Sequence, residues 1–204
     1  MKDALQVNSM LTQQGFETLV VTDDTKTNIT PTAANLLSAL KNTIEGCEDG
    51  DHVLFYFSGH VGRVFDGEDQ KYHEALIAAD GPMFDIDLVH LFESLPAGVN
   101  FTVIVDGCYG RPYSPEEKTH FHDATRGFYL VSHAVDPKSK EMSYTAGGAL
   151  TNSLVTILKE NNYVIPLEKL KESIASLLKT LNLSLITSPT ENVSGQYFLD
   201  LTSA

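Results

Sequence analysis

Apolar positions along the chain follow two patterns, short continuous runs and longer segments with apolar residues at helical spacing. Two runs, HVLFYFS (52–58) and NFTVIVDG (100–107), are apolar almost throughout, which is typical of strands buried on both faces of a sheet. Shorter runs predict further strands at 16–21, 74–80, 127–133 and 195–201. The periodic segments predict helices before Gly15, from Pro31 to Gly46, and over 85–95, 148–160 and 167–181.

The order of these elements predicts an α/β fold. Strands alternate with helices, so we expect a three-layer α/β/α sandwich with a mainly parallel sheet and helices on both faces. The chain of 204 residues is 42% hydrophobic, which is enough for one sizeable core. No repeat, low-complexity tract or linker divides the sequence, so residues 1–204 are expected to form a single domain.

Charge and cysteine content narrow the class of partner. The chain has 14 basic and 27 acidic residues, a formal net charge of −13. Nucleic acids and anionic membranes bind basic surfaces, so a neutral or cationic partner suits this chain better. Two cysteines, Cys47 and Cys108, make no disulfide framework. Because the sequence has neither a signal-peptide pattern nor a membrane-length apolar run, we expect a soluble, cytoplasmic protein.

Both core strands end in reactive residues, Ser58-Gly59-His60 after the first and Asp106-Gly107-Cys108 after the second. Ligands of open α/β sheets bind at the carboxyl ends of the strands, so His60 and Cys108 are expected to share one rim. A nearby imidazole activates a thiol, and backbone N–H groups around Gly59 and Cys108 are candidates for stabilising an oxyanion. The alternative is a structural strand-end histidine and a small buried cysteine. The conjunction of both motifs favours catalysis.

The motifs FYFSGH, FDGEDQKYHEALIAAD and LPAGVNFTVIVDGCYG resemble those of metacaspases and the prokaryotic caspase-like peptidases called orthocaspases. The resemblance extends through GGALTNSLVTIL to the last strand. It implies a large-subunit-like part (1–108), a loop (109–126) and a small-subunit-like part (127–204). It also implies that Cys108 is the nucleophile and His60 its general base.

The same resemblance implies a substrate with Arg or Lys at P1, the residue before the cleaved bond. Asp3, Ser58 and Asp106 match the positions that hold this residue in metacaspases, so the expected partner is a protein or peptide with a basic P1 residue. An anionic pocket agrees with the acidic balance of the chain. The alternative for Asp106 is a carboxylate that caps a turn at the strand end.

Three departures from the family pattern stand out, one of which is Tyr109 in place of the His or Arg that commonly follows the cysteine. Val61 replaces the glycine that usually follows the histidine, so the expected oxyanion donors are Gly59, Val61 and Cys108, and the β-branched side chain is expected to narrow the cleft or bend the loop. The apolar strand that precedes the first helix in the family has no counterpart. That sheet position is therefore empty, or filled by another segment or another chain, and an empty position leaves a strand edge exposed.

The resemblance also bears on self-cleavage and metal binding. Basic residues in the loop that caspase-like enzymes often cut are candidate self-cleavage positions: Arg111, Lys118 and Arg126. Some metacaspases use calcium, and here only Asp85, with Asp87 nearby, matches the acidic set. Calcium prefers six to eight oxygens, so no cofactor is expected to be required. The acidic loop at Asp66–Asp69 is expected to be a solvated hairpin tip rather than a cation site.

The sequence thus predicts a cysteine endopeptidase that cleaves after Arg or Lys. The main alternative is a catalytically impaired caspase-fold pseudoenzyme that acts as a regulatory interaction module, an alternative motivated by Val61 and the missing strand. A nucleotide- or phosphate-binding flavodoxin-like domain ranks lower because no Gly-rich strand-to-helix fingerprint is present.

Overall fold

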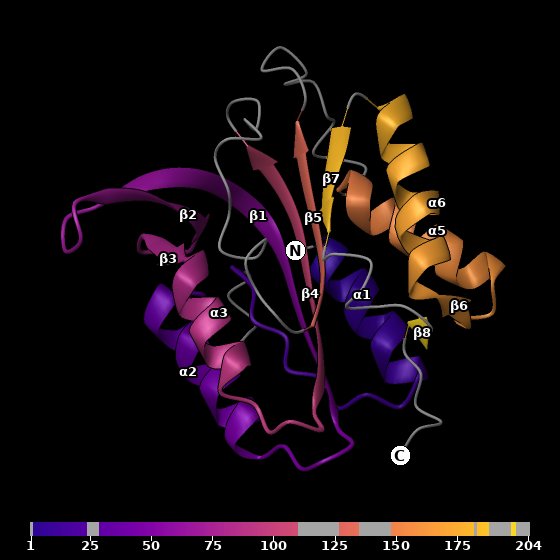
Figure 1. Ribbon diagram of the computed structural model, residues 1–204, viewed down its shortest axis with the longest axis horizontal. Helices are drawn as coiled ribbons and strands as arrows, with labels where there is room; N and C mark the ends of the chain where they lie inside the picture. Colours follow the sequence, from indigo (N-terminus) through magenta and orange to yellow (C-terminus); the bar gives the residue numbers. More distant parts are fainter. Residues whose placement is uncertain are drawn as a thin grey trace.

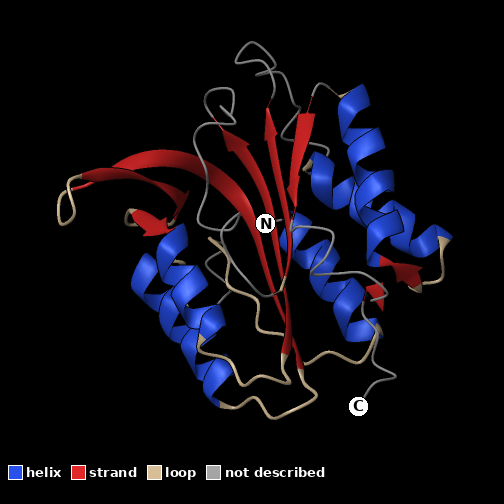
Figure 2. Ribbon diagram, in the orientation of Figure 1, coloured by secondary structure: helices blue, strands red, loops and turns tan. Residues whose placement is uncertain are grey.

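A computed structural model of the chain shows a twisted sheet between two helical layers (Figures 1 and 2). The structure describes residues 2–23, 29–109, 127–134, 148–181, 183–187 and 197–198. The described helices are α1 (Lys2–Gln13), α2 (Ala33–Glu45), α3 (Asp85–Glu93), α5 (Ala149–Glu160) and α6 (Leu167–Thr180). The described strands are β1 (His52–Asp66), β2 (Lys71–Ile77), β3 (Pro82–Phe84), β4 (Asn100–Tyr109), β5 (Phe128–Ala134), β6 (Ile165–Pro166), β7 (Leu183–Thr187) and β8 (Tyr197–Phe198).

The main sheet has the strand order β3-β2-β1-β4-β5-β7. Its three central strands, β1, β4 and β5, are parallel, whereas β2, β3 and β7 pair antiparallel. The described connection from β1 to β4 contains β2, β3 and α3, in keeping with the long crossover that parallel neighbours require. The expected layered α/β fold is confirmed, with the parallel part at its centre.

Each face of the sheet packs against its own helices. Helices α1, α5 and α6 cover one face, and α2 and α3 cover the other (Figure 1). A hydrophobic core lies on each face of the sheet, and alternate residues of β4 pack into one or the other. Ile104 packs into the core on the α1–α5–α6 side, whereas Val103 and Val105 pack into the core on the α2–α3 side. All three side chains are fully buried. This explains the continuous apolar run at 100–107, because both faces of the strand are covered. No helix in the described part of the chain is both long and apolar enough to span a membrane.

Strand β1 is longer than the predicted 52–58 and changes partner along its length. It pairs with β4 from His52 to Val61 and with β2 from Val61 to Asp66. Its second half therefore leaves the central sheet as a curved hairpin with β2 (Figure 1). His60 lies immediately before this change of partner, at the carboxyl end of the central part.

Two expected strands differ in the structure. Residues 16–21 are not a strand, because no described strand pairs with them and a β-ladder needs a hydrogen-bonding neighbour. In the expected strand 195–201, the described pair Tyr197–Phe198 forms β8, which pairs with β6 outside the main sheet. The main sheet ends instead with β7, which the sequence did not predict.

Candidate active site at the carboxyl ends of β1 and β4

The backbone register of β1 and β4 brings the two predicted motifs together. Ser58 pairs with Asp106, and His60 pairs with Cys108, as Cα partners on neighbouring parallel strands. Adjacent strands lie about 4.8 Å apart, so the two reactive positions are neighbours on one rim. His60 is solvent-exposed. The backbone of Cys108 belongs to β4, and its side chain lies outside the described residues.

Asp3 comes to the same rim from the first turn of α1. Its Oδ2 atom accepts hydrogen bonds from Ser58 Oγ at 2.9 Å and from the Gly148 N–H at 3.0 Å. Its Oδ1 atom is buried and has no hydrogen-bond partner in the described part of the chain. An unsatisfied buried carboxylate oxygen is energetically costly, and a cationic ligand that reaches it would remove this cost.

Asp106 is held by the start of α5. Its Oδ2 accepts hydrogen bonds from the backbone N–H of Thr151 at 2.8 Å and from the Thr151 hydroxyl at 2.5 Å. Its Oδ1 accepts a longer bond of 3.3 Å from Ser132 Oγ. The carboxylate therefore caps a helix from a neighbouring strand, where it also faces the positive end of the helix dipole. The capping alternative for Asp106 thus has a structural basis, with a helix in place of a turn.

Burial raises the pKa of the Asp106 carboxyl, and the nearby charge of Asp3 acts in the same direction. The hydrogen bonds from Thr151 and Ser132 oppose this shift without cancelling it. Gly148 allows this close approach of helix and strand, since a Cβ atom at position 148 would lie 1.9 Å from Asp106 Oδ2. Asp3 and Asp106 consequently form an acidic pair at this rim, and both carboxylates accept hydrogen bonds from the start of α5.

Sequence reasoning missed Tyr56 and Thr151. The Tyr56 hydroxyl lies 2.6 Å from Thr151 Oγ1, which links β1 to the Asp106 cap. Burial raises the pKa of Tyr56, so the phenol is neutral at physiological pH. One signal was present: a tyrosine inside a buried strand needs a hydrogen-bond partner, and Tyr56 shares its alternation with Ser58 and His60. Nothing in the sequence identified Thr151 as that partner.

Val61 packs into the core. Its side chain is 5% exposed, and a Cβ atom at Gly107 would lie 2.1 Å from Val61 Cγ2. The β-branched side chain therefore covers Gly107 on the α2–α3 side of the sheet. Gly107 on β4 has no side chain, and the side chain of Val61 occupies the space that one would fill. The expected narrowing of the cleft therefore does not follow from Val61.

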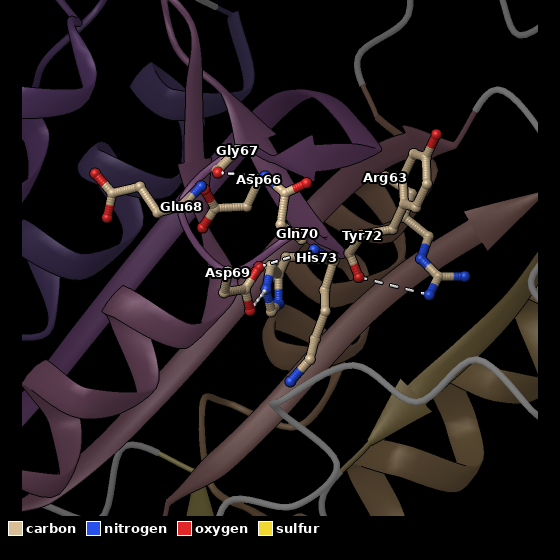
Figure 3. A network of polar contacts seen from close by, with 9 residues as sticks. Arg63, Asp66, Gly67, Glu68, Asp69, Gln70, Tyr72 and His73 are labelled. Carbon is tan, nitrogen blue, oxygen red and sulfur yellow. Dashed lines mark hydrogen bonds and ion pairs between the residues drawn. The ribbon is translucent and has the colours of Figure 1, made fainter.

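The acidic hairpin tip is held together by its own hydrogen bonds (Figure 3). The N–H of Glu68 donates to Asp66 Oδ1, and the N–H of Lys71 donates to Asp69 Oδ1, both at 2.9 Å. His73 Nε2 lies 2.6 Å from Asp69 Oδ2. Desolvation acts to raise the pKa of Asp69, but the hydrogen bonds and charges of His73 and Lys71 together outweigh it and lower that pKa. These contacts show that Asp66 and Asp69 stabilise the turn between β1 and β2.

Within the described ranges, Asp66, Asp69 and His73 form the one group whose candidate metal-ligating atoms lie within 4.8 Å of one another. The weak calcium candidates are not part of it: on α3, Asp85 is buried, whereas Asp87 is exposed. The candidate self-cleavage residues Arg111, Lys118 and Arg126 lie outside the described residues.

The layered sheet, with a His motif and an Asp-Gly-Cys motif in register at the carboxyl ends of adjacent parallel strands, defines a protein of the caspase-like class. The family model "Metacaspase, peptidase C14 domain" matches residues 1–113, more than half of the chain. The chain belongs to this family.

Similar proteins agree with this assignment. Metacaspase-9 of Arabidopsis thaliana is 32% identical over 105 residues, which cover 48% of this chain and 32% of that protein. Metacaspase-1 of Yarrowia lipolytica is 34% identical over 101 residues, which cover 45% of this chain and 22% of that protein. The matched part of this chain therefore spans about a third or less of the length of these relatives.

A solved structure shares the fold. The crystal structure of protein GSU0716 from Geobacter sulfurreducens superimposes with a TM-score of 0.70 at 16% identity, covering 95% of this chain and 86% of that chain. At this identity the likeness concerns the fold alone.

Proposed function

We propose that this protein is a cysteine endopeptidase that hydrolyses peptide bonds after Arg or Lys. The observation that carries the proposal is the register of β1 and β4, which pairs His60 with Cys108, together with the hydrogen bond that Ser58, two residues before His60, donates to the carboxylate of Asp3. Membership of the metacaspase family supports the same chemistry. The exposure of His60 also suits a residue that must meet a polypeptide from solution.

In the proposed mechanism, His60 takes the proton of the Cys108 thiol, and the thiolate attacks the carbonyl carbon of the P1 residue. The backbone N–H groups of Gly59, Val61 and Cys108 are the candidate donors to the oxyanion. Collapse of the tetrahedral intermediate releases the amine, which takes the proton from His60, and leaves a thioester. Water then attacks the thioester with His60 as base and regenerates the thiol. No metal is needed in these steps.

The preference for a basic P1 residue rests on Asp3. Among the described residues its buried Oδ1 atom has no hydrogen-bond partner, while its Oδ2 atom is anchored by Ser58 and Gly148. A P1 guanidinium or ammonium would supply the missing charge-assisted hydrogen bond. Both oxygens of Asp106 already accept hydrogen bonds, so Asp106 would contribute negative charge rather than the principal contact. Asp3 is therefore the principal residue that binds the P1 side chain in this proposal, with Ser58 holding its orientation.

The second candidate is a caspase-fold module that binds partners without cleaving them. The observation in its favour is a cavity of about 710 Å³ lined by residues of α1, α2 and the first half of β1, whose lining residues do not include His60. The two candidates differ in one property, since only the peptidase needs the thiol of Cys108.

Hydrolysis of fluorogenic peptides ending in Arg, Lys or Asp, with and without calcium, tests the proposal. We expect Arg and Lys peptides to be cleaved and the Asp peptide to be left intact. Cys108→Ala and His60→Ala should abolish the activity, whereas His90→Ala, at an exposed histidine of α3, should retain it. A lack of hydrolysis under all conditions, together with no labelling of Cys108 by an Arg-directed thiol-reactive peptide, would favour the binding module.

Self-processing is tested with the same variants. Incubation of the active protein is expected to produce fragments ending at Arg111, Lys118 or Arg126, identified by mass spectrometry, and Cys108→Ala should remain intact. Equal stability of the two proteins would exclude intramolecular cleavage in this loop.

A further inference from the structure

A short chain of hydroxyl groups connects the interior of the sheet to the carboxylate of Asp106. The Tyr56 hydroxyl lies 2.6 Å from Thr151 Oγ1, and Thr151 Oγ1 donates a hydrogen bond of 2.5 Å to Asp106 Oδ2. The backbone N–H of Thr151 donates to the same oxygen at 2.8 Å. Thr151 is fully buried, whereas Asp106 is partly exposed at the rim. The chain therefore leads from inside the molecule to a carboxylate that a ligand can approach.

The ionised form of Asp106 fixes the direction of this chain. An ionised carboxylate only accepts hydrogen bonds, and a threonine hydroxyl has one proton to donate. Thr151 donates that proton to Asp106, so its oxygen is the acceptor of the proton that Tyr56 donates. Ser58 also interacts with Tyr56, but it donates its own proton to Asp3 and so is not a donor to the phenol. The hydroxyl protons of Tyr56 and Thr151 therefore both point towards Asp106.

A protonated Asp106 fits the same contacts less well. A proton on Oδ2 would face the N–H of Thr151, because that oxygen already receives two hydrogen bonds. The proton would have to settle on Oδ1, whose contact with Ser132 Oγ is the longer one at 3.3 Å. The bonds from Thr151 would then lose the strength that a charged acceptor gives them. Tyr56 and Thr151 consequently favour the ionised form of Asp106.

Two influences favour the neutral form of Asp106 instead. Desolvation by burial raises the pKa of its carboxyl, and the charge of Asp3 on α1 acts in the same direction. The two carboxylates approach Gly148 together, since its N–H donates to Asp3 Oδ2 and a Cβ there would lie 1.9 Å from Asp106 Oδ2. The contacts from α5 and β5 are made by uncharged groups of Thr151 and Ser132. The charge of Asp106 thus depends on its hydrogen bonds outweighing burial and Asp3.

We propose that Tyr56 and Thr151 are positioning residues that keep Asp106 ionised, so that the P1 pocket presents both carboxylate charges to an Arg or Lys side chain. This inference rests on the proposed peptidase function, in which Asp3 makes the principal contact with the P1 cation and Asp106 supplies charge. When Asp106 takes up a proton, the pocket loses one of its charges and binds the P1 cation more weakly. The hydroxyl chain therefore sets the acidic pH at which recognition of a basic P1 residue fails.

Infrared spectroscopy of the full chain reads the protonation of Asp106 without any substrate. The C=O stretch of a protonated carboxyl group is separate from the bands of an ionised one, so a pH titration of this band gives a midpoint. Because the chain has 27 acidic residues, each protein is compared with the same protein carrying Asp106→Asn. Thr151→Val removes the hydroxyl but keeps the N–H, and should raise the midpoint by about one pH unit. Tyr56→Phe should raise it by less, because Tyr56 acts through Thr151.

Two further variants separate the positioning role from a general loss of packing. Thr151→Ser keeps a hydroxyl at the same place and should restore the wild-type midpoint. Ser153→Ala removes another buried hydroxyl of α5 and should leave the midpoint unchanged. Circular dichroism verifies that each variant is folded.

Hydrolysis of an Arg-terminated peptide over a range of pH tests the link to P1 recognition. In Thr151→Val, the rise of KM towards acidic pH should begin at higher pH than in wild type, by the same amount as the infrared midpoint moves. The value of kcat at saturating substrate should change less than KM, because the lost charge acts on binding of the P1 side chain. In an Asp106→Asn background, Thr151→Val should cause no further change in this profile, since it acts through Asp106.

Three outcomes decide the matter. The same infrared midpoint in wild type and Thr151→Val would overturn the proposal. A pH profile that still moves in the Asp106→Asn background would also overturn it, because the Thr151 hydroxyl would then act on another group. A shifted midpoint in a chain that hydrolyses no peptide would support the effect of the hydroxyl chain on Asp106, and would overturn the peptidase function on which the P1 role rests.

Discussion

Asp3 and Ser58 are joined by a hydrogen bond of 2.9 Å, although the first lies in the opening turn of α1 and the second at the carboxyl end of the central part of β1. The same Asp3 oxygen accepts the N–H of Gly148 at the start of α5. One carboxylate thus connects three elements at the rim where His60 and Cys108 are in register. Its second oxygen remains buried and unsatisfied within the described chain.

Asp3→Asn is expected to raise KM for Arg- and Lys-terminated peptides about ten- to one-hundred-fold. The substitution removes the charge that would hold the P1 cation, and hydrogen bonds to charged groups contribute roughly 1.5–3 kcal/mol. Steady-state kinetics with paired Arg and uncharged P1 substrates measures the effect. Ser58→Ala, which loosens Asp3 without removing its charge, should cause a smaller change. An unchanged KM in Asp3→Asn would exclude Asp3 from the P1 pocket.

Asp106 is expected to make stability depend on pH. Its folded-state pKa is raised, so the folded protein binds this proton more tightly than the unfolded chain does. The resulting stabilisation is fully present below the ordinary aspartate pKa of 3.8 and is lost as pH rises through the raised value. Urea unfolding of wild type and Asp106→Asn should therefore show wild type gaining stability relative to the variant as pH falls from 7 towards 4. A pH-independent difference would contradict the assignment.

Asp106→Ala separates the capping role from this titration. It leaves the N–H of Thr151 without its acceptor, and loss of a helix cap costs about 0.5–2 kcal/mol. We expect a lower free energy of unfolding at pH 7 in this variant than in Asp106→Asn, which keeps a side-chain oxygen able to accept the bond. Equal stabilities would show that the cap contributes little.

Val61 and Gly107 are expected to be energetically coupled. Gly107→Ala would place a methyl group against Val61 Cγ2, and overpacking of this kind costs about 1–3 kcal/mol. The double variant Gly107→Ala, Val61→Gly should be more stable than the sum of the two single changes predicts, by at least about 0.5 kcal/mol. Chemical denaturation of the four proteins closes the cycle. Gly62→Ala is the matched control, since no atom lies within 4 Å of a Cβ there; strict additivity would refute the contact.

Tyr56→Phe is expected to lower the free energy of unfolding by about 1 kcal/mol. The change removes the hydroxyl that lies 2.6 Å from Thr151 Oγ1 and leaves the ring in place. Tyr72→Phe, at an exposed position of the β1–β2 hairpin, is the control and should have a smaller effect. If both variants lose the same stability, the buried Tyr56–Thr151 contact is not a special contributor.

Several structural features were accessible from local sequence patterns. The runs at 52–58 and 100–107 predicted strands buried on both faces because every side chain in such a strand meets a core. The rim containing His60 and Cys108 followed from a general property of parallel strands, whose carboxyl ends share one edge. The catalytic role assigned to these two residues remains a prediction.

Other features depended on partners that no local pattern reveals. The segment 16–21 has the composition of a strand, yet it is not one because strand formation requires a neighbouring ladder and none is described beside it. Likewise, Asp106 was expected either to hold a substrate or to cap a turn. Its actual partner, Thr151, lies 45 positions further along the chain.

The sequence by itself thus determined the layered α/β fold and the two reactive strand ends, since hydrophobic periodicity and short motifs are local properties. Only the tertiary structure decided which residues contact the side chains around those strand ends. It paired the oxygens of Asp106 with Thr151 of α5 and Ser132 of β5, left one oxygen of Asp3 without a hydrogen-bond partner in the described part of the chain, and buried Val61 against Gly107. These outcomes depend on the distances between segments far apart in the chain, which are set by packing of the whole molecule and not by any single stretch of it.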